Sequence, residues 1–199
     1  MNLVLGGGNL LRGDDAVGPV VGRRLLERGL PEGTEVADGG TAGMDVAFRM
    51  RGADRVVLLD AAATGGEPGS IYRLHGDDVA ELPDLSTINL HSFRWDHALA
   101  FAKWLFRRDA ANGGRRWGPD DLPGDGEPGY PAEVVVYLIE AASFGFGDPL
   151  SPVVDAAADR LVDRLLDELS GDWATPATPG GPDVPAGPDV DDTIAEGVG

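Results

Sequence analysis

The sequence contains no cysteine, and this absence removes several classes of site at once. A disulfide framework, a zinc site built on thiolates and a cysteine nucleophile are all excluded. No run of about 18 apolar residues appears, so no membrane-spanning helix is expected. The chain also lacks the basic start and apolar stretch of a signal peptide, because Met1 leads straight into a strand-like Asn2-Leu-Val-Leu. A cytoplasmic protein without a membrane partner is therefore expected.

Lysine is nearly absent as well. Lys103 is the only lysine, and 16 basic residues face 34 acidic ones, which gives a net charge of −18. Nucleic-acid binding depends on clustered lysine and arginine, so nucleic acid is not expected as a partner. Hydrophobic residues make up 42% of the 199 residues, which is enough to bury the core of one domain.

Two segments lack the periodicity of helices and strands. Residues 171–199 are rich in proline, glycine and aspartate and contain no basic residue. Their apolar surface is too small to offset the entropy of ordering, so a disordered acidic tail is expected. Residues 109–131 are interpreted as an irregular surface insertion. The rest of residues 1–170 is predicted to form a single α/β domain, and a monomer is expected.

Strand and helix patterns alternate along this domain. Buried strands are predicted at Leu3–Leu5, Glu35–Ala37, Arg55–Asp60, Ser70–Leu74 and Glu133–Ile139. Helices are predicted from about Asp15 to Arg28, after Thr41, from about Ser92 to Phe106, and from Ser151-Pro152 to about Leu169, with Ser151 as the capping side chain. This alternation predicts a three-layer α/β sandwich, in which a twisted, mostly parallel sheet of about five strands lies between helices.

Acidic side chains follow several of the predicted strands. Asp14 and Asp15 come after the first strand, and Asp38 comes after the second. Asp60 closes the third strand, and His91 precedes a predicted helix. Sites in parallel sheets form beyond the carboxyl ends of the strands, so these groups are expected to converge on one face. Two carboxylates and an imidazole form a suitable ligand set for nickel, zinc or manganese.

Each of these residues also has a structural interpretation. Asp14 and Asp15, taken alone, are typical of charges that the dipole stabilises at a helix N-terminus. Asp60 ends a run of four apolar residues and needs a partner there, which a neighbouring loop can provide. A lone histidine such as His91 is more often structural than a metal ligand.

The glycine-rich turn after the first strand suggests nucleotide binding, but its details disagree with that interpretation. Gly6-Gly7-Gly8 lacks the third glycine of a dinucleotide-binding motif, because Leu11 stands at that position. The spacing from Gly8 to Gly13 fits a phosphate-binding loop, yet Asp14 replaces the lysine and repels anions. Nucleotide binding stays a minor alternative. Neither Gly-x-Ser-x-Gly nor His-Glu-x-x-His is present, which disfavours a serine hydrolase and an ordinary zinc protease.

Three segments and one histidine carry a resemblance to a known family. The first segment, from Leu5 to Gly18, reads Leu-Gly-Gly-Gly-Asn-Leu-Leu-Arg-Gly-Asp-Asp-Ala-Val-Gly. The second is Asp38-Gly-Gly-Thr-Ala-Gly-Met44, and the third is Leu58-Leu-Asp60-Ala followed by Gly66-Glu-Pro-Gly69. The histidine lies in Asn89-Leu-His91. Together they resemble the nickel-iron hydrogenase maturation endopeptidases, over roughly residues 1–106 and 133–169.

This resemblance implies a function and a set of site residues. The family removes a C-terminal extension from the precursor of the hydrogenase large subunit after nickel insertion, which makes this chain an expected endopeptidase of aspartyl type. By motif, Asp15, Asp60 and His91 correspond to the groups that contact nickel, which the substrate carries. Asp38 lies beside glycines that allow close approach, and it is the candidate catalytic residue, for positioning or for base chemistry.

Two departures from the family pattern concern substrate choice. Ser92-Phe-Arg-Trp follows the histidine where a different segment is usual, and the insertion at residues 109–131 is longer than compact members need. Both changes alter regions that could determine which large subunit is recognised, and neither removes a proposed ligand. The alternative from another class is a non-catalytic nickel-sensing or chaperone-like protein on the same fold.

Overall fold

The computed structural model describes residues 1–41, 43–76, 98–99, 101–103 and 130–171. Its elements are β1 (Asn2–Gly7), a short 3-10 helix η1 (Gly13–Ala16), α1 (Val17–Arg28), β2 (Thr34–Gly40), α2 (Gly43–Arg49), β3 (Arg55–Ala62), β4 (Ile71–His75), β5 (Glu133–Glu140) and α5 (Pro152–Ser170). The described residues between 98 and 103 are helical too. None of the helices in these ranges is long and apolar enough to span a membrane.

The strands form one sheet in the order β2-β1-β3-β5-β4. β1 pairs in parallel with β2 and β3, and β3 pairs in parallel with β5, so four strands finish at the same edge. β4 is an antiparallel edge strand beside β5. The predicted α/β sandwich with a mostly parallel sheet is confirmed.

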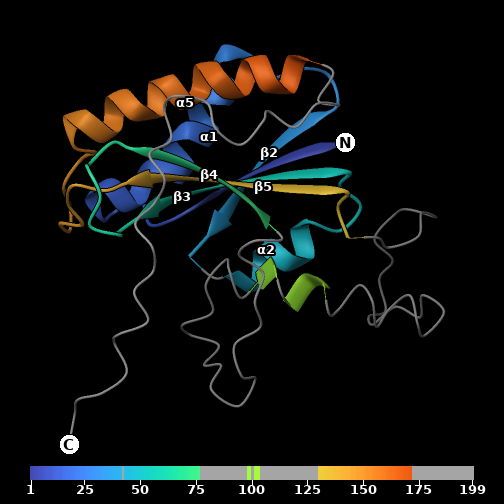
Figure 1. Ribbon diagram of the computed structural model, residues 1–199, viewed down its shortest axis with the longest axis horizontal. Coiled ribbons are helices and arrows are strands. Elements are labelled where there is room, and N and C mark those ends of the chain that lie inside the picture. Colours follow the sequence, from blue (N-terminus) through green and yellow to red (C-terminus); the bar gives the residue numbers. More distant parts are fainter. Residues whose placement is uncertain (42, 77–97, 100, 104–129, 172–199) are drawn as a thin grey trace, which may run out of the picture.

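Helices cover both faces of this sheet, as Figure 1 shows, with α1 and α5 on one side and α2 on the other. Successive strand residues therefore point into two different cores. Val4, Val57 and Val135 pack with α1 and α5, whereas Leu3, Val56 and Val134 pack on the face of α2. Because both faces are buried, the strands read as continuous apolar runs and not as an alternation of apolar and polar residues.

α1 approaches the sheet closely because its second residue is a glycine, Gly18. A Cβ atom built on Gly18 would lie 2.2 Å from the carbonyl oxygen of Gly7 and 2.5 Å from that of Leu59. Any side chain at this position would collide with the backbones of β1 and β3. The first turn of α1 can thus rest directly on the two strand ends, where the functional cleft described below is found.

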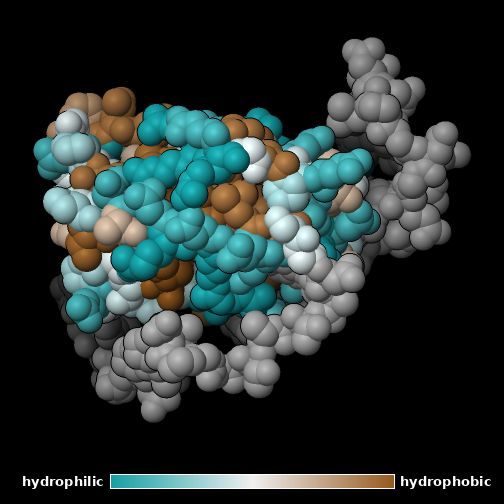
Figure 2. Space-filling model, turned by 90° about the horizontal axis from the view of Figure 1, so that it is seen from above, coloured by the Kyte–Doolittle hydropathy of each residue, from teal (hydrophilic) through white to brown (hydrophobic). Residues whose placement is uncertain are grey.

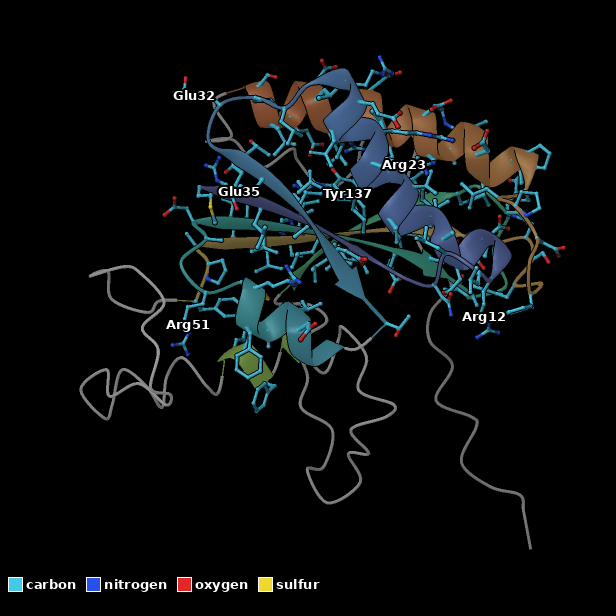
Figure 3. The ribbon with its side chains drawn as sticks, turned by 180° about the vertical axis from the view of Figure 1, so that it is seen from behind. Arg12, Arg23, Glu32, Glu35, Arg51 and Tyr137 are labelled. Atoms are coloured by element: carbon cyan, nitrogen blue, oxygen red, sulfur yellow. The ribbon has the colours of Figure 1, made fainter. Side chains whose placement is uncertain are left out.

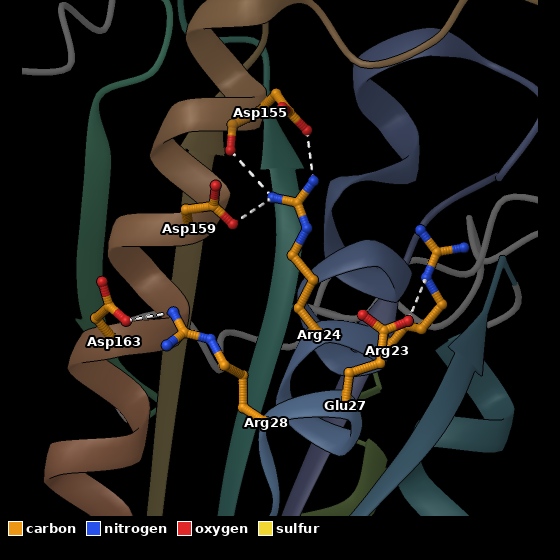
Figure 4. Close-up of polar contacts among 7 residues, drawn as sticks. All are labelled: Arg23, Arg24, Glu27, Arg28, Asp155, Asp159 and Asp163. Carbon is orange, nitrogen blue, oxygen red and sulfur yellow. Dashed lines mark hydrogen bonds and ion pairs between the residues drawn. The ribbon is translucent and has the colours of Figure 1, made fainter.

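Ion pairs join the exposed sides of α1 and α5, as Figure 4 shows. The guanidinium of Arg24 lies 2.5 Å from a carboxylate oxygen of Asp155 and 2.9 Å from one of Asp159, and Arg28 lies 2.5 Å from Asp163. Pairs at this level of exposure contribute little energy singly. They link the two helices, whose outer surface is mostly hydrophilic in Figure 2.

A polar network lies inside the layer between the sheet and α5. The buried hydroxyl of Tyr137 donates to Glu168 at 2.8 Å and accepts a bond from Nε of Arg73 at 3.1 Å. Arg164 lies over the Tyr137 ring and bonds to Glu168 at 2.9 Å. Burial, followed by the neighbouring Glu168 carboxylate, raises the pKa of Tyr137 above its ordinary value.

Two local predictions were wrong. α1 begins at Val17 and not near Asp15, because residues 13–16 form the tighter η1. Ser151 does stand immediately before α5, but its side chain does not cap the helix. Its hydroxyl donates instead to the carboxylate of Asp14, at 2.9 Å. The charged carboxylate of Asp14 thus binds the Ser151 side chain that would otherwise cap α5.

Other predictions lie outside the described residues. These are most of the helix expected from about Ser92 to Phe106, nearly all of the insertion at 109–131, and the tail at 171–199 apart from Gly171. The single domain over residues 1–170 and the disordered tail therefore stay predictions.

Candidate functional site

A cleft of about 440 Å³ opens at the carboxyl edge of the sheet. It lies where the chain reverses direction across the sheet: β1 leads through α1 to β2, and β2 leads back through α2 to β3 on the other side of β1. Parallel sheets place their binding sites at such switch points. The residues that line it are Gly7, Gly8, Asp15, Gly39, Gly40, Thr41, Val46, Asp60, Ala61, Ala62, Ala63, Thr64, Leu138 and Phe144.

Two of the predicted ligands, Asp15 and Asp60, lie in this cleft beside the turn that ends β1. A Cβ atom on Gly7 would lie 3.2 Å from Oδ2 of Asp60. One on Gly8 would lie 1.8 Å from the carbonyl oxygen of Asp15 and 3.6 Å from Oδ1 of Asp60. Gly8 also has a φ of +121°, which L side chains rarely adopt. Glycine at these positions therefore lets the backbone of Asp15 and the side chain of Asp60 lie close to this turn.

Backbone amides orient both carboxylates. Oδ2 of Asp15 accepts a bond from the amide of Asn9 at 3.2 Å, and Oδ1 of Asp60 accepts one from the amide of Ala61 at 2.8 Å. Both residues are half-buried. These bonds fix the direction of each carboxylate, and carboxylate oxygens suit a metal ion or a polarised water molecule.

The remaining predicted site residues differ in their placement. Asp38 lies within β2, is exposed, and accepts a bond from the amide of Gly40 at 2.7 Å. Its side chain is not part of the cleft lining, although Gly39 and Gly40 are. His91 lies outside the described residues. His75 is the one histidine within the described ranges, and its pairing with Val135 places it at the opposite end of the sheet.

Within the described part of the chain, no group of three or more histidine, cysteine, aspartate or glutamate side chains could hold a metal ion. The pair Asp15 and Asp60 supplies two hard oxygen donors. A tightly bound resident metal needs more ligands than these two. These two donors are counted without His91, which lies outside the described residues.

Asp14 is not the exposed helix charge that its position suggested, because its side chain is fully buried. One carboxylate oxygen accepts bonds from the amides of Ala142 and Ser143 at 2.8 and 2.9 Å and from the hydroxyl of Ser151. The other accepts the amide of Ser151 at 2.6 Å. Asp14 thus ties η1, beside the cleft, to the segment between β5 and α5.

Glu140 is a second buried carboxylate that binds a segment beside the cleft, and the sequence analysis missed it. It ends β5 and is 2% exposed. Oε1 accepts the amides of Thr64, Gly65 and Gly66 at 2.8, 2.8 and 3.2 Å, and Oε2 accepts the hydroxyl of Thr64 at 2.8 Å. The signal was available, because Glu140 ends an apolar run as Asp60 does. Its carboxylate fixes the loop that forms one wall of the cleft.

The comparisons with known proteins agree on one family. Residues 19–111 match the family model HycI, described as hydrogenase maturation protease. A putative hydrogenase maturation protease of Methanocaldococcus jannaschii is 30% identical over 173 residues, which cover 84% of this chain and 95% of that protein. The hydrogenase 2 maturation protease of Escherichia coli is 38% identical over 82 residues, covering 42% of this chain and half of that protein.

Solved structures support the same relationship. The structure of the hydrogenase maturating endopeptidase HybD from Escherichia coli superposes with a TM-score of 0.62 and 26% identity. The superposition covers 84% of this chain and 91% of that one. The likeness thus extends over most of both chains.

Proposed function

Because the chain belongs to the hydrogenase maturation protease family and is therefore a peptidase, we propose that it removes the C-terminal extension of a nickel-iron hydrogenase large-subunit precursor. We propose further that it cuts only after nickel has been inserted. The nickel belongs to the substrate, and Asp15, Asp60 and His91 contact it. The observation that carries this proposal is the meeting of Asp15 and Asp60 in one cleft across the Gly7-Gly8 turn.

The ligand chemistry supports recognition of a metal that the substrate carries. Nickel binds imidazole well and tolerates carboxylates. Two carboxylates without a thiolate hold the ion weakly, so it can leave with the processed subunit. A precursor without nickel lacks this contact and is released uncut. Cleavage of the peptide bond would then depend on completed insertion of the metal.

The chemical step needs a water molecule and a proton acceptor beside the scissile bond. Nickel can polarise the scissile carbonyl or activate water. Alternatively, a carboxylate in the cleft can accept the proton of the attacking water. Asp38 has a positioning role in this proposal, since its carboxylate holds the amide of Gly40 in the turn that lines the cleft.

The test is incubation of the full chain with a large-subunit precursor in nickel-loaded and nickel-free forms, followed by intact mass measurement. The proposal expects loss of a C-terminal peptide from the nickel-loaded form only. Stable binding without loss of mass would support the non-catalytic alternative. Cleavage of both forms at equal rates would refute nickel recognition and leave the peptidase activity standing.

A further inference from the structure

Four large apolar side chains follow the carboxyl ends of β1 and β5, and one of them lines the cleft. Leu10 and Leu11 follow β1, and Phe144 and Phe146 follow β5. Leu10 and Leu11 are each 59% exposed and Phe146 is 81% exposed, whereas Phe144 is half-buried and lines the cleft. We call these four residues the apolar lip. In Figure 2 hydrophobic surface gathers at the left end, which is the end at which β1, β3 and β5 finish in Figure 1.

Hydrogen bonds hold the two parts of the lip side by side. The amide of Gly147 donates to the carbonyl of Leu11 at 2.8 Å, and the amide of Asp14 donates to that of Ser143 at 3.0 Å. The buried carboxylate of Asp14 binds the second part as well. The exposed side chains therefore project from two segments that hydrogen bonds hold to each other.

The lip is also tied to a candidate ligand. The amide of Asn9 donates to the Asp15 carboxylate, and the Asn9 side chain accepts the amide of Leu11 at 2.9 Å. Figure 3 shows the next residue, Arg12, at the end of the sheet where α1 begins. A substrate that contacts Leu11 would therefore lie next to the carboxylate that we propose to meet its nickel.

Exposed apolar side chains that cluster beside a polar cleft mark a binding surface, because each costs hydration free energy until a partner covers it. A peptide cut in the cleft has to leave it on both sides of the scissile bond. The lip borders one of these exits and shares Phe144 with the cleft wall.

We propose that the apolar lip binds bulky apolar side chains in the segment of the hydrogenase precursor next to the bond that is cut. This inference rests on the proposed function and adds the chemistry of the segment that is recognised. The lip selects the peptide, and the carboxylates of the cleft select its metal-loaded state.

The experiment compares Leu11→Ser and Phe146→Ser with Leu26→Ser in the full chain, with the nickel-loaded precursor as substrate. Leu26 is a matched control because it is 55% exposed, close to Leu11, and lies on α1 away from the lip. We expect each lip variant to raise KM about tenfold with kcat kept. Leu26→Ser should leave both constants within about twofold, and all three should melt near the unmodified chain, since the side chains are mostly exposed.

A double-mutant cycle locates the contact. Apolar residues of the precursor beside the cut are changed to serine one at a time. One of these changes should raise KM with the unmodified chain and add little to the effect of Leu11→Ser or Phe146→Ser. Fully additive effects at every such position would overturn the proposal.

The two proposals fail differently. An unmodified chain that never cuts refutes the proposed function, and the lip is then tested by the Kd of the precursor, which Leu11→Ser should still raise. Lip variants that cut or bind with unchanged constants refute the lip. If they only disperse a dimer of this chain, measured by sedimentation, the lip is a self-association surface and the proposal is overturned.

Discussion

The carboxylate of Asp14 accepts hydrogen bonds from both the backbone amide and the hydroxyl of Ser151, 137 residues further along the chain. Its two oxygens both receive amide donors, because Ala142 and Ser143 bind the second oxygen. A buried carboxylate satisfied in this way lets the start of α5 and the η1 segment move only as a unit. The segment that bears half of the apolar lip is anchored by the same residue.

Replacing Asp14 with asparagine should therefore destabilise the protein strongly. Asparagine offers one acceptor oxygen, so its NH2 group must face a backbone amide that also donates. We expect the free energy of unfolding in urea to fall by about 2–4 kcal/mol. Glu32→Gln, on an exposed side chain, should change it by less than about 0.5 kcal/mol. An Asp14→Asn protein as stable as the control would contradict this account.

Glu140 should respond differently to the same kind of change. Only Oε1 binds amides, and Oε2 faces the Thr64 hydroxyl, which can accept a bond as well as donate one. Glutamine can keep every contact, so Glu140→Gln should cost about 1 kcal/mol or less, whereas Glu140→Ala should cost about 3 kcal/mol. Amide hydrogen exchange of Thr64, Gly65 and Gly66 measures directly whether the loop stays bound to Glu140. Equal exchange in the alanine variant and the unmodified chain would show that Glu140 does not hold it.

Much of the fold followed from hydrophobic patterning. Continuous apolar runs such as Val56–Leu59 and Val134–Tyr137 predict strands covered on both faces, and the helices between them require parallel connections. The start of α1 was misplaced because Asp14 and Asp15 look like residues of a first helical turn. The hydrogen bonds that Ser151 donates to Asp14 span 137 residues, so no short stretch of sequence reveals them.

The site was predictable to a similar depth. The switch-point rule brought Asp15 and Asp60 to the same edge, and the structure places both in one cleft. Asp38 lies near the expected end of β2, but its side chain is exposed, and the neighbouring Gly39 and Gly40 line the cleft instead. Glu140 ends an apolar run as Asp60 does, but its partners are backbone amides 74 to 76 residues away in the sequence, which no local pattern pairs with it.

Gly18 and Gly22 make a matched pair within α1. A Cβ at Gly18 meets two backbone oxygens, whereas one at Gly22 meets only a methyl group of Val36, at 3.1 Å. Gly18→Ala should lower stability by about 3 kcal/mol and displace α1 from the strand ends. Gly22→Ala should stay within about 1 kcal/mol, because better helix propensity offsets the contact. Thermal unfolding of both variants measures the difference, and similar melting temperatures would show that α1 does not need this close approach.

The cleft carboxylates should be required for processing. Asp15→Asn, Asp60→Asn and His91→Ala are each expected to reduce cleavage of the nickel-loaded precursor by about 100-fold or more, with little change in melting temperature. Precursor processing measured by intact mass provides the rate. Near-normal cleavage by the Asp60→Asn or His91→Ala variant would remove that residue from the site.

Two substitutions of Asp38 distinguish a positioning role from a role as general base. Asparagine keeps an oxygen for the Gly40 amide, so a positioning role predicts that Asp38→Asn retains activity and Asp38→Ala loses about tenfold. A general base would be lost in both variants. Cleavage rates of the two variants with the nickel-loaded precursor distinguish the two roles, since only loss of a base lowers the rate in both. Full activity in Asp38→Ala would leave the residue with neither role.

Tyr137 should make the fold sensitive to alkali. Burial and Glu168 raise the pKa of its phenol in the folded state, while the unfolded chain ionises near its ordinary value of about 10. A raised pKa gives stability that is complete below about pH 10 and is lost as the pH rises further, because the unfolded chain then releases a proton that the folded chain retains.

The Tyr137→Phe variant has no phenol hydroxyl and therefore no proton to release at this position. Near neutral pH it should be less stable by about 1 kcal/mol, from the lost hydrogen bonds. By about pH 11 the difference should shift by about 1.4 kcal/mol in favour of Tyr137→Phe, so the variant should then be at least as stable as the unmodified chain. Urea unfolding of both proteins at about pH 8 and pH 11 measures this change, and a difference that stays constant between them would show that Tyr137 ionises equally in both states.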